Sequence, residues 1–582
     1  MVKKPSAGGY LSHVSAFIAF FLISTPLFSD NSQKVLLLSF DGGMNSRIHD
    51  YLGGTFSAKK GFTFIQREGV LAKNGMTVTL PSLTAVSHLS IITGMSPAQH
   101  GVVSNFFHIV TDPIHQDIDG FSAPLDPNAE TLWEYARKHH KTVGVVSYPG
   151  LDNTHARRSA DWSINFSKSL SPSDLLRFKK SDFKSYTKAI PKEVRSFSEP
   201  QITDLSQGLS LIYEENNKLN MPPFHIIALD TTDDHTTNYD TFVFDLDDNL
   251  DNGFVGKTDH QVKWIGLGFT AENSLKGSWC KLILASPTLS EMEFYVGAVY
   301  QTIAFPASFQ TQIDQKLGFW TGPPLRELER FHLTKEDFFI QARRLSEYLK
   351  EATVLGAQTQ QWDLIISYQP LLDEIEHQFL NDESIVRRGY AQADSVVHDL
   401  VSHLPNTNHI YVSDHGMAPL TSVYYPNREL MKDGFISDIY KARAFSSGGF
   451  SHIYINLEGR QKNGIIPPSD FNQLRDRLIQ LFQDKAPVAK IYTRENAAGV
   501  GLNRPNSGDV MMVAKPGYHF SNDMGNGDVL GPADFAGQHG YDPDLPSMKA
   551  IYAAWGPQIE RKAVSDLSYK HVYPFILKLL GI

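Results

Sequence analysis

The chain has 582 residues, of which 41% are hydrophobic and 11% aromatic, and its net charge is −10. This length predicts about three or four domains, with one enlarged α/β domain as the alternative. The negative charge and the lack of a long Lys/Arg run argue against a nucleic-acid-binding surface, which requires a basic patch.

The N-terminal segment is typical of an export signal peptide. Lys3 and Lys4 give it a positive start, residues 14–28 are almost wholly apolar, and Ser29 suits a cleavage site. The apolar run is shorter than the roughly 20 residues of a membrane span, so an uncleaved anchor is the alternative. Because Cys280 is the only cysteine, no internal disulfide framework is expected. Together these features predict a periplasmic or secreted protein.

The middle and end of the chain alternate between strand and helix patterns. Residues 34–40 (KVLLLSF) form a near-continuous apolar run, which is typical of a strand buried on both faces. Further elements are predicted as a helix at 131–140, a strand at 141–150, a strand at 362–368, a helix at 384–404 and a strand at 409–416. This alternation predicts an α/β fold with a doubly wound, mostly parallel sheet and helices on both faces.

Changes in sequence character predict how the chain is divided. Residues 200–324 contain several β-like segments and few helical ones, which favours a β-rich insertion. The predicted parts are a signal peptide at 1–29, a catalytic α/β domain at 30–199, 325–466 and 531–582, the insertion at 200–324, and a small α+β cap at 467–530.

The stretch from Leu80 to Asn105 predicts an anion-binding helix start. A polar cluster that includes Thr84 opens a short apolar helix, and Gly94 ends it. Free amides and the positive end of the helix dipole gather at such a start. From these residues alone, Thr84 is either a nucleophile or an N-cap, and the N-cap is the commoner role for threonine.

Carboxylates and imidazoles stand at the ends of several predicted strands. They are Asp41, Asp373 with His377, Asp414 with His415, and His539 in a glycine-flanked turn. A helix would place Asp373 and His377 on one face, because they are four residues apart. Asp414 and His415 can both reach one metal only if the backbone turns, which Gly416 permits. These ligand types at one sheet edge suit zinc, and manganese less well.

Each ligand motif also has an ordinary explanation. The Asp373/His377 pair could be a surface salt bridge or a cap, and His539 could be a simple turn histidine. The sequence SDHG at residues 413–416 could form a common turn. The prediction of a metal site therefore depends on the conjunction of several strand ends with suitable ligands.

Five motifs in this order resemble the alkaline phosphatase superfamily, and most closely its type I phosphodiesterase/nucleotide pyrophosphatase branch. They are FDGG at Asp41, SLTAVSH…TGMSPAQHGVVSN around Thr84, YQPLLDEIEH at Asp373, SDHGM at Asp414 and QHGYDP at His539. The resemblance covers roughly residues 34–180 and 345–582 and leaves the predicted insertion unexplained. It implies an alkaline-phosphatase-like fold.

The resemblance also implies a site with two Zn²⁺ ions per chain. One ion would be bound by Asp41, Thr84, Asp414 and His415, and the other by Asp373, His377 and His539. Thr84 would be the nucleophile and would form a phospho-threonine intermediate that water hydrolyses. Asn105 would donate to a non-bridging phosphoryl oxygen. In this context the nucleophile becomes the preferred interpretation of Thr84.

The residues around the motif bear on the substrate. Relatives that bind nucleotides commonly have an aromatic residue directly after the nucleophilic threonine, but Ala85 stands here, so a nucleobase clamp is missing. Side chains that could belong either to the pocket or to the core are Phe106, Phe107, Tyr148 and Trp162. Arg157 and Arg158 could contact phosphate, although a solvated pair is the preferred interpretation.

We therefore expect an exported, zinc-dependent phosphodiesterase or nucleotide pyrophosphatase that acts on a small phosphorylated substrate; its oligomeric state is left open. The alternatives are a secreted alkaline phosphatase-type phosphomonoesterase and a non-catalytic metal-binding protein on this scaffold. The resemblance implies that threonine-dependent monoesterases of the superfamily carry a Lys-x-Arg pair. Residues 164–174 (INFSKSLSPSD) contain no such pair, which favours a diester.

Overall fold

The computed structural model describes residues 33–54, 60–185, 209–213, 218–230, 236, 238–246, 254–257, 264–272, 274–565 and 567–582. The predicted signal peptide at residues 1–29 lies outside the described residues, as do parts of the predicted insertion. Among the described helices, none combines the length and the apolar character that a membrane crossing requires.

A mixed β-sheet of eight strands, counted within the described residues, forms the centre of the fold. Its order is β18-β7-β6-β19-β1-β20-β29-β2. The strands are β1 (Val35–Phe40), β2 (Val70–Leu71), β6 (Val143–Val146), β7 (Trp162–Ile164), β18 (Ala304–Phe305), β19 (Leu364–Gln369), β20 (Asn408–Val412) and β29 (Tyr552–Trp555). The run from β7 to β20 is parallel, and the outer strands join it by antiparallel pairs. The predicted doubly wound, mostly parallel sheet is confirmed.

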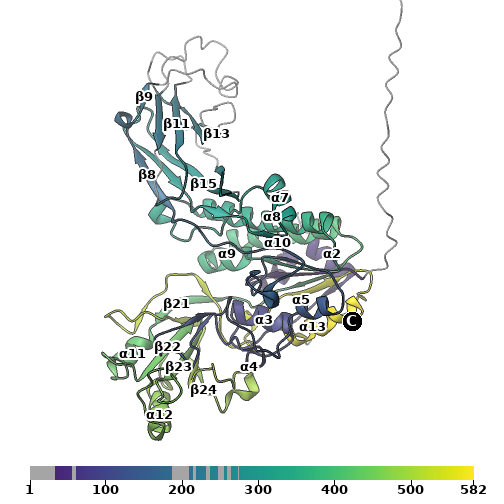
Figure 1. Cartoon of the computed structure of the whole chain (residues 1–582), viewed down its shortest axis with the longest axis vertical. Coiled ribbons are helices and arrows are strands. Elements are labelled where there is room, and N and C mark those ends of the chain that lie inside the picture. The colour runs from purple at the N-terminus through teal and green to yellow at the C-terminus, as the bar shows by residue number, and fades with distance from the viewer. Residues whose placement is uncertain are drawn as a thin grey trace, which may run out of the picture. The chain divides into compact units, whose positions relative to one another are not determined.

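Helices cover both faces of this sheet (Figure 1). Alternate residues of β1 enter different cores: Val35 and Leu37 belong to one, and Leu36 and Leu38 belong to the other. Helices α3 (Thr84–Thr93), α5 (Leu132–Lys138) and α13 (Val572–Leu580) pack in the first core, and α1 (Asn45–Gly53), α2 (Gly61–Glu68), α8 (Lys335–Thr359), α9 (Leu371–Phe379) and α10 (Glu383–His403) pack in the second. This explains why the strand reads as a continuous apolar run.

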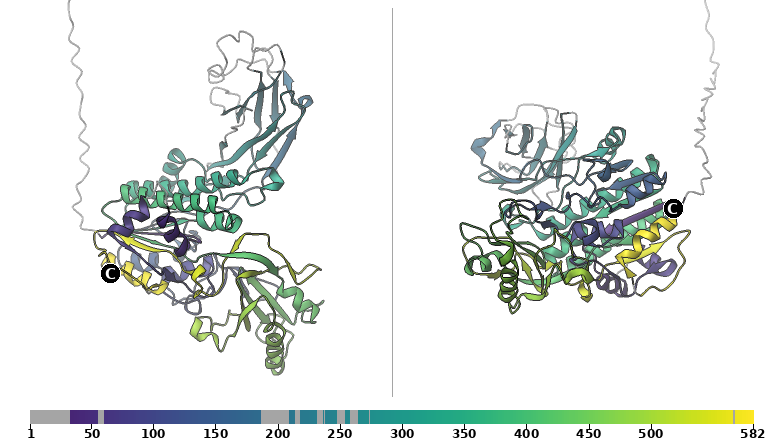
Figure 2. Two further views of the ribbon diagram at one scale, coloured as in Figure 1. Left: turned by 180° about the vertical axis from the view of Figure 1, so that it is seen from behind. Right: turned by 60° about the horizontal axis from the view of Figure 1, so that its bottom comes forward.

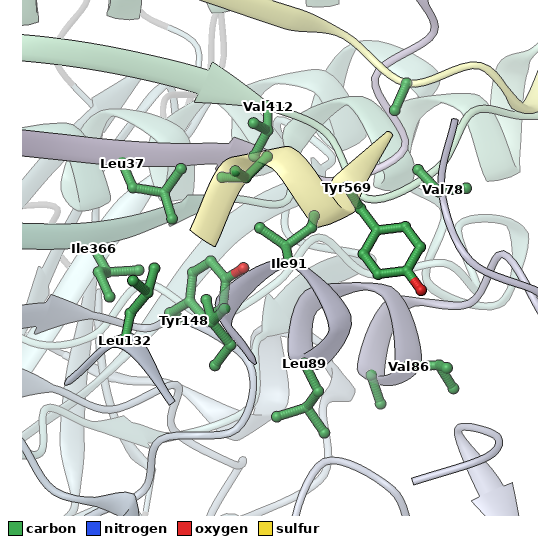
Figure 3. Close-up of a cluster of buried hydrophobic side chains, with 14 of the residues drawn as sticks. Leu37, Val78, Val86, Leu89, Ile91, Leu132, Tyr148, Ile366, Val412 and Tyr569 are labelled. Carbon is green, nitrogen blue, oxygen red and sulfur yellow. The ribbon is translucent and has the colours of Figure 1, made fainter. Parts of the chain in front are cut away.

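The first core fixes helix α3 against the sheet. Figure 3 shows Leu37, Ile366 and Val412 from the strands on one side and Ile91 of α3 facing them. All ten residues of α3 are buried, so the helix has no solvent-exposed face along which it could shift. Its first residue, Thr84, is held at the edge of the sheet as a result.

Two antiparallel sheets lie between β7 and β18 in the sequence. One has the order β13-β12-β11-β10-β9 and the other β14-β15-β16-β8, with β17 beside β15. Their strands are β8 (Asp174–Phe178), β9 (Lys184–Ser185), β10 (Leu209–Tyr213), β11 (Phe224–Leu229), β12 (Thr241–Asp245), β13 (Phe254–Lys257), β14 (Ile265–Ala271), β15 (Ser274–Ala285), β16 (Met292–Val296) and β17 (Tyr300–Gln301). The two sheets share one hydrophobic core, which includes the buried Cys280. Strand β8 precedes the boundary predicted at residue 200.

A third group of elements follows β20. It contains β21 (Ala418–Tyr424), α11 (Pro426–Lys432), β22 (Ala442–Ser447), β23 (Phe450–Ile455), α12 (Phe471–Phe482), β24 (Val488–Thr493), β25 (Val510–Ala514), β26 (Gly517–Phe520), β27 (Leu530–Pro532) and β28 (Gly537–Gln538). These elements build a hydrophobic core of their own and are drawn mainly in green in Figure 2. Strand β28 pairs with β21 and leads directly into His539.

Candidate active site

All the predicted ligands except His539, which follows β28, come after the carboxyl ends of three neighbouring parallel strands. Asp41 comes directly after β1, helix α9 with Asp373 comes after β19, and Asp414 comes after β20. These strands are adjacent in the order β19-β1-β20. The carboxyl edge is where open α/β sheets gather functional side chains. The structure thus brings together residues that lie far apart in the sequence.

The inner group of candidate ligands consists of Asp41, Asp414 and His415, whose possible donor atoms lie within 4.8 Å of one another. His415 Nε2 is 3.0 Å from Asp414 Oδ2 and 3.3 Å from Asp41 Oδ1. Thr84 Oγ1 is 3.3 Å from the same nitrogen. The three ligand side chains are only 0–1% exposed. All four residues predicted around one ion therefore lie side by side.

The outer group consists of Asp373, His377 and His539, whose donor atoms also lie within 4.8 Å of one another. Asp373 Oδ1 is 3.3 Å from His377 Nε2 and 3.7 Å from His539 Nε2. His377 Nδ1 lies 2.9 Å from the carbonyl oxygen of Gly537, and His539 Nδ1 lies 3.0 Å from that of Ser82. A carbonyl only accepts, so each Nδ1 carries the proton and each Nε2 is left as a ligand atom.

The two groups are in contact with each other. The rings of His415 and His539 stack with centroids 3.6 Å apart, and the Asp373 N–H donates to the carbonyl oxygen of Asp41. Gly42 makes this approach possible, because it has a φ of +70° and a Cβ there would lie 2.8 Å from the Asp373 Cα. A glycine is also required at position 416, because a Cβ there would lie 2.0 Å from the carbonyl oxygen of Ser547. The close approach of the Ser547 main chain therefore excludes any side chain at position 416.

The donor set fits divalent cations. Asp41 Oδ1, Asp373 Oδ1 and Asp414 Oδ2 are buried without a hydrogen-bond partner, which is costly for a carboxylate. Ligand atoms about 2.0 Å from a tetrahedral zinc lie about 3.3 Å apart, close to the separations in both groups. Burial, reinforced by the charges of Asp414 and Asp373, raises the pKa of Asp41 well above its usual value. A bound cation would offset that unfavourable charge density.

Thr84 is the first residue of α3, and Leu83 is the N-cap. No side chain caps this helix start, so the N-cap interpretation of Thr84 is wrong and its hydroxyl is left beside His415. Asn105 Oδ1 accepts a hydrogen bond from the Ala85 N–H at 2.9 Å. Because the side-chain oxygen of Asn105 is already occupied by this bond, its NH₂ group is available to donate into the cavity.

A cavity of about 760 Å³ opens over these residues. The predicted residues that line it are Asp41, Thr84, Asn105, Asp373, His377 and His539. Its other walls include the aromatic side chains of Phe121, Tyr148, Phe166 and Tyr300 and the cationic side chains of Arg158, Lys168 and Arg326. The outer group therefore faces the cavity, whereas Asp414 and His415 lie behind its surface.

The aromatic candidates divide between pocket and core. Tyr148, Phe107 and Trp162 are all 1–2% exposed and belong to the hydrophobic cores, but Tyr148 also borders the cavity. Phe106 is 43% exposed and, among the described residues, is not part of the cavity wall. Of these four aromatic candidates, Tyr148 is the one that borders the cavity.

The prediction of a solvated pair is wrong for Arg158, whereas the side chain of Arg157 is 35% exposed. Arg158 is 4% exposed, forms an ion pair with Asp152 and donates to the carbonyl oxygen of Phe121. Arg157 forms an ion pair with Glu134. Carboxylates and carbonyls from neighbouring loops, which the local sequence does not reveal, satisfy both guanidinium groups. Arg158 thereby fixes two walls of the cavity.

Sequence reasoning missed the side chains that support the ligands. The Tyr368 hydroxyl donates to Asp41 Oδ2 at 2.5 Å, and His88 Nδ1 lies 3.3 Å from Asp414 Oδ2. Lys168 and Arg326, which line the cavity, were not predicted either. The only local indication for His88 is its position four residues after Thr84, which places both on one face of α3.

Comparisons with known proteins match this chain to a single protein family. A family model described as type I phosphodiesterase/nucleotide pyrophosphatase matches residues 35–233 and 331–542. An ectonucleotide pyrophosphatase/phosphodiesterase of Caenorhabditis elegans is 24% identical over 229 residues, which are 38% of this chain and 24% of that protein. Human ectonucleotide pyrophosphatase/phosphodiesterase family member 7 is 30% identical over 135 residues, which are 22% of this chain and 28% of that protein.

These matches span about a quarter of the length of the two curated relatives. Among solved structures, human ectonucleotide pyrophosphatase/phosphodiesterase 5 matches with a TM-score of 0.49 and 16% identity, over 94% of this chain and 95% of that chain.

Proposed function

This chain belongs to the type I phosphodiesterase/nucleotide pyrophosphatase family of the alkaline phosphatase superfamily, and from that membership we propose that it is an exported, zinc-dependent phosphodiesterase. The observation that carries the proposal is the position of the Thr84 hydroxyl, which lies 3.3 Å from His415 at the floor of a cavity beside two clusters of ligands. Export is proposed from the N-terminal sequence, which lies outside the described residues.

The proposed ligands divide as the two groups do. Asp41, Asp414 and His415, with Thr84, would hold one Zn²⁺, and Asp373, His377 and His539 would hold a second. Bound zinc would acidify the nucleophilic hydroxyl and stabilise negative charge on the entering and leaving oxygens.

Thr84 would act as the nucleophile. Its Oγ1 forms a bond to phosphorus while the bond to the leaving oxygen breaks, and the hydroxyl proton ends on the departing alcohol. Water then cleaves the phospho-threonine bond, restores the hydroxyl and releases a phosphomonoester. The Asn105 NH₂ group would donate to a non-bridging oxygen during both steps, because its Oδ1 is held by Ala85.

The charges around the cavity favour a diester over a monoester. A monoester brings a second charged non-bridging oxygen and needs more donors. Arg158 and Arg326 already form ion pairs with Asp152 and Glu374, which leaves Lys168 as the one lining cation without an ion pair among the described residues. This supports a small phosphodiester or phosphoanhydride as the substrate.

Turnover of two aryl substrates tests the reaction class. We expect kcat/KM for bis(4-nitrophenyl) phosphate to exceed that for 4-nitrophenyl phosphate by at least an order of magnitude. A preference for the monoester of that size would make the protein a phosphomonoesterase instead.

The Thr84→Ala variant tests the nucleophile. We expect it to keep its fold and both zinc ions but to lose turnover by on the order of 10⁴-fold or more, as enzymes do when the attacking group is removed. Metal analysis of the purified variant and the parent provides the control. Turnover close to that of the parent would show that another group attacks, and a parent without zinc would favour the non-catalytic alternative.

A further inference from the structure

His88 is a buried histidine directly behind the inner group. It lies on α3 one turn after Thr84, and its side chain is 0% exposed. Its Nδ1 lies 2.8 Å from the carbonyl oxygen of Thr84 and 3.3 Å from Asp414 Oδ2, and its Nε2 lies 2.9 Å from Ser39 Oγ. Three segments, β1, α3 and the end of β20, therefore meet at one imidazole ring.

These contacts fix the tautomer of His88. Both neighbours of Nδ1 are acceptors, so Nδ1 carries the proton, and Nε2 then accepts from the Ser39 hydroxyl. The N–H of Nδ1 donates to the Thr84 carbonyl oxygen and at the same time faces Asp414 Oδ2 at 3.3 Å, an oxygen that has no hydrogen-bond partner of its own among the described residues. The other oxygen of Asp414 accepts a hydrogen bond from the Gly42 N–H at 3.2 Å, so Gly42 holds one side of the carboxylate and the His88 ring faces the other side.

One of the three contacts is common in helices and carries no weight alone. His139 and His403, both exposed on other helices, also place Nδ1 2.8–2.9 Å from the carbonyl oxygen four residues earlier. The contacts with Ser39 and Asp414 are what distinguish His88. Burying an imidazole for packing alone would be costly, since an apolar side chain fills the same space without a polar group to satisfy.

Aromatic rings hold the imidazole in place. Tyr148 and Tyr368 pack edge-on against it, with centroids 4.9 and 5.4 Å away. The Tyr148 hydroxyl donates to the His88 carbonyl oxygen, and the Tyr368 hydroxyl donates to Asp41 Oδ2. Strand register places Tyr368 next to Ser39. The ring of His88 is thus fixed among the side chains that support both inner carboxylates.

We propose that His88 is a positioning residue that ties the start of α3, and with it the Thr84 hydroxyl, to the carboxylate of Asp414. The inference rests on the proposed function, because it assigns His88 to the metal-binding inner group and the nucleophile. His88 itself does not touch the cavity among the described lining residues. It acts by fixing the distance between the Asp414 carboxylate and Thr84, and residues that contact metal ligands from outside the site commonly have this role.

Two substitutions separate this role from packing. The amide nitrogen of His88→Asn can occupy the place of Nδ1, whereas that of His88→Gln approaches the place of Nε2 and leaves Asp414 Oδ2 without the N–H that faces it. We expect His88→Gln to weaken binding of one zinc by about 10- to 100-fold, the usual effect of losing such a partner, and to lower kcat with little change in KM. His88→Asn should retain most of the zinc affinity.

Zinc affinity is measured by competition with a chromophoric chelator in the absence of substrate, together with the Tm of the metal-free variants. His139→Gln, which changes an exposed histidine with the same contact to the carbonyl four residues earlier, is the control and should leave zinc affinity unchanged. An unchanged zinc affinity in His88→Gln would overturn the proposal. It would also be overturned if His88→Gln and His88→Asn lost the same amount of zinc affinity in proportion to their loss of Tm, because a packing defect alone would then explain the result.

Ser39→Ala gives a second test if the His88 variants do not fold. It removes the hydroxyl that donates to Nε2 and should weaken one zinc site by a few-fold, an effect that a purely packed His88 would not produce. The outcomes for the two proposals are distinguishable. A parent protein that binds two zinc ions and turns over diesters, but whose affinity is unchanged by either substitution, overturns only the role of His88, whereas a parent that binds no zinc overturns the proposed function.

Discussion

The inner and outer groups contain the same ligand types but are built differently. Asp41, Asp414 and His415 are 0–1% exposed, whereas the members of the outer group are 5–9% exposed and all line the cavity. Side chains support the inner carboxylates, through Tyr368 and His88. Main-chain carbonyls orient the outer imidazoles. Within the inner group, Asp414 and His415 are thus part of the protein core and Asp41 alone reaches the cavity, whereas the whole outer group lines the cavity.

Removal of one carboxylate from each group gives the largest expected effects. Asp414→Ala should lose one zinc and lower kcat/KM by about 10³- to 10⁴-fold, because metal stabilisation of the reacting oxygens is worth several kcal/mol. Asp373→Ala should also lose one zinc but keep the inner one. Zinc content and diester turnover are measured on both variants. Loss of both ions from Asp373→Ala would show that the groups do not bind independently.

Chelation tests the difference in exposure between the two groups. We expect a chromophoric chelator to remove zinc in two phases, first from the cavity-lining outer group and then from the buried inner group, since opening of a buried site requires local unfolding. His377→Ala should abolish the fast phase and leave the slow one. Release of both ions in one phase would contradict a kinetic distinction between core and cavity.

The residues of the two candidate ligand groups could be singled out from the sequence, whereas the side chains that support them could not. Each ligand stands in a short motif at a strand end, so local patterns reveal it. The contact between Tyr368 and Asp41 instead depends on the pairing of β1 with β19, which joins Ser39 to Tyr368 across more than 300 residues. Nothing local marks a tyrosine at the end of a buried strand as a hydrogen-bond donor to a ligand.

The same limit applies to the fold. The alternation of apolar strands and helices was sufficient to predict the parallel sheet, because β1 is buried on both faces. The start of the β-rich sheets was not predicted, since β8 at residues 174–178 pairs with β16 more than 100 residues later. Long-range pairing also explains the correction for Arg158, whose partner Phe121 lies in another loop.

Tyr368→Phe tests the side-chain support of the inner group with a smaller expected effect. Loss of the hydroxyl that donates to Asp41 should weaken inner-group zinc binding by about 10-fold, the lower end of the range for outer-shell partners. Tyr411→Phe is the matched control, because Tyr411 is a buried tyrosine of the neighbouring part of the sheet, in β20, and its hydroxyl contacts His409 rather than a candidate ligand. The slow phase of zinc release should accelerate in Tyr368→Phe and stay unchanged in Tyr411→Phe.

Lys168 lies on the cavity wall and belongs to neither group, so its substitution should change substrate binding without changing metal content. It is exposed, and a single exposed charge contact is worth roughly 1 kcal/mol or less, or at most about 5-fold in KM. We expect Lys168→Gln to raise KM for substrates with an additional negative charge more than for bis(4-nitrophenyl) phosphate, with kcat unchanged. Lys316→Gln, at the exposed end of α7 (Ala307–Lys316), provides the control for a lost surface charge.

The Lys168→Gln variant also tests whether the cavity wall acts independently of the two candidate ligand groups. If the cavity wall only selects substrates, the ratio of KM values will change with salt, because exposed charges are screened, and the two phases of zinc release will keep their rates. A change in either release rate would mean that the wall and the ligand groups form one unit. In that case the cavity-lining outer group could not be treated separately from the residues that surround the substrate.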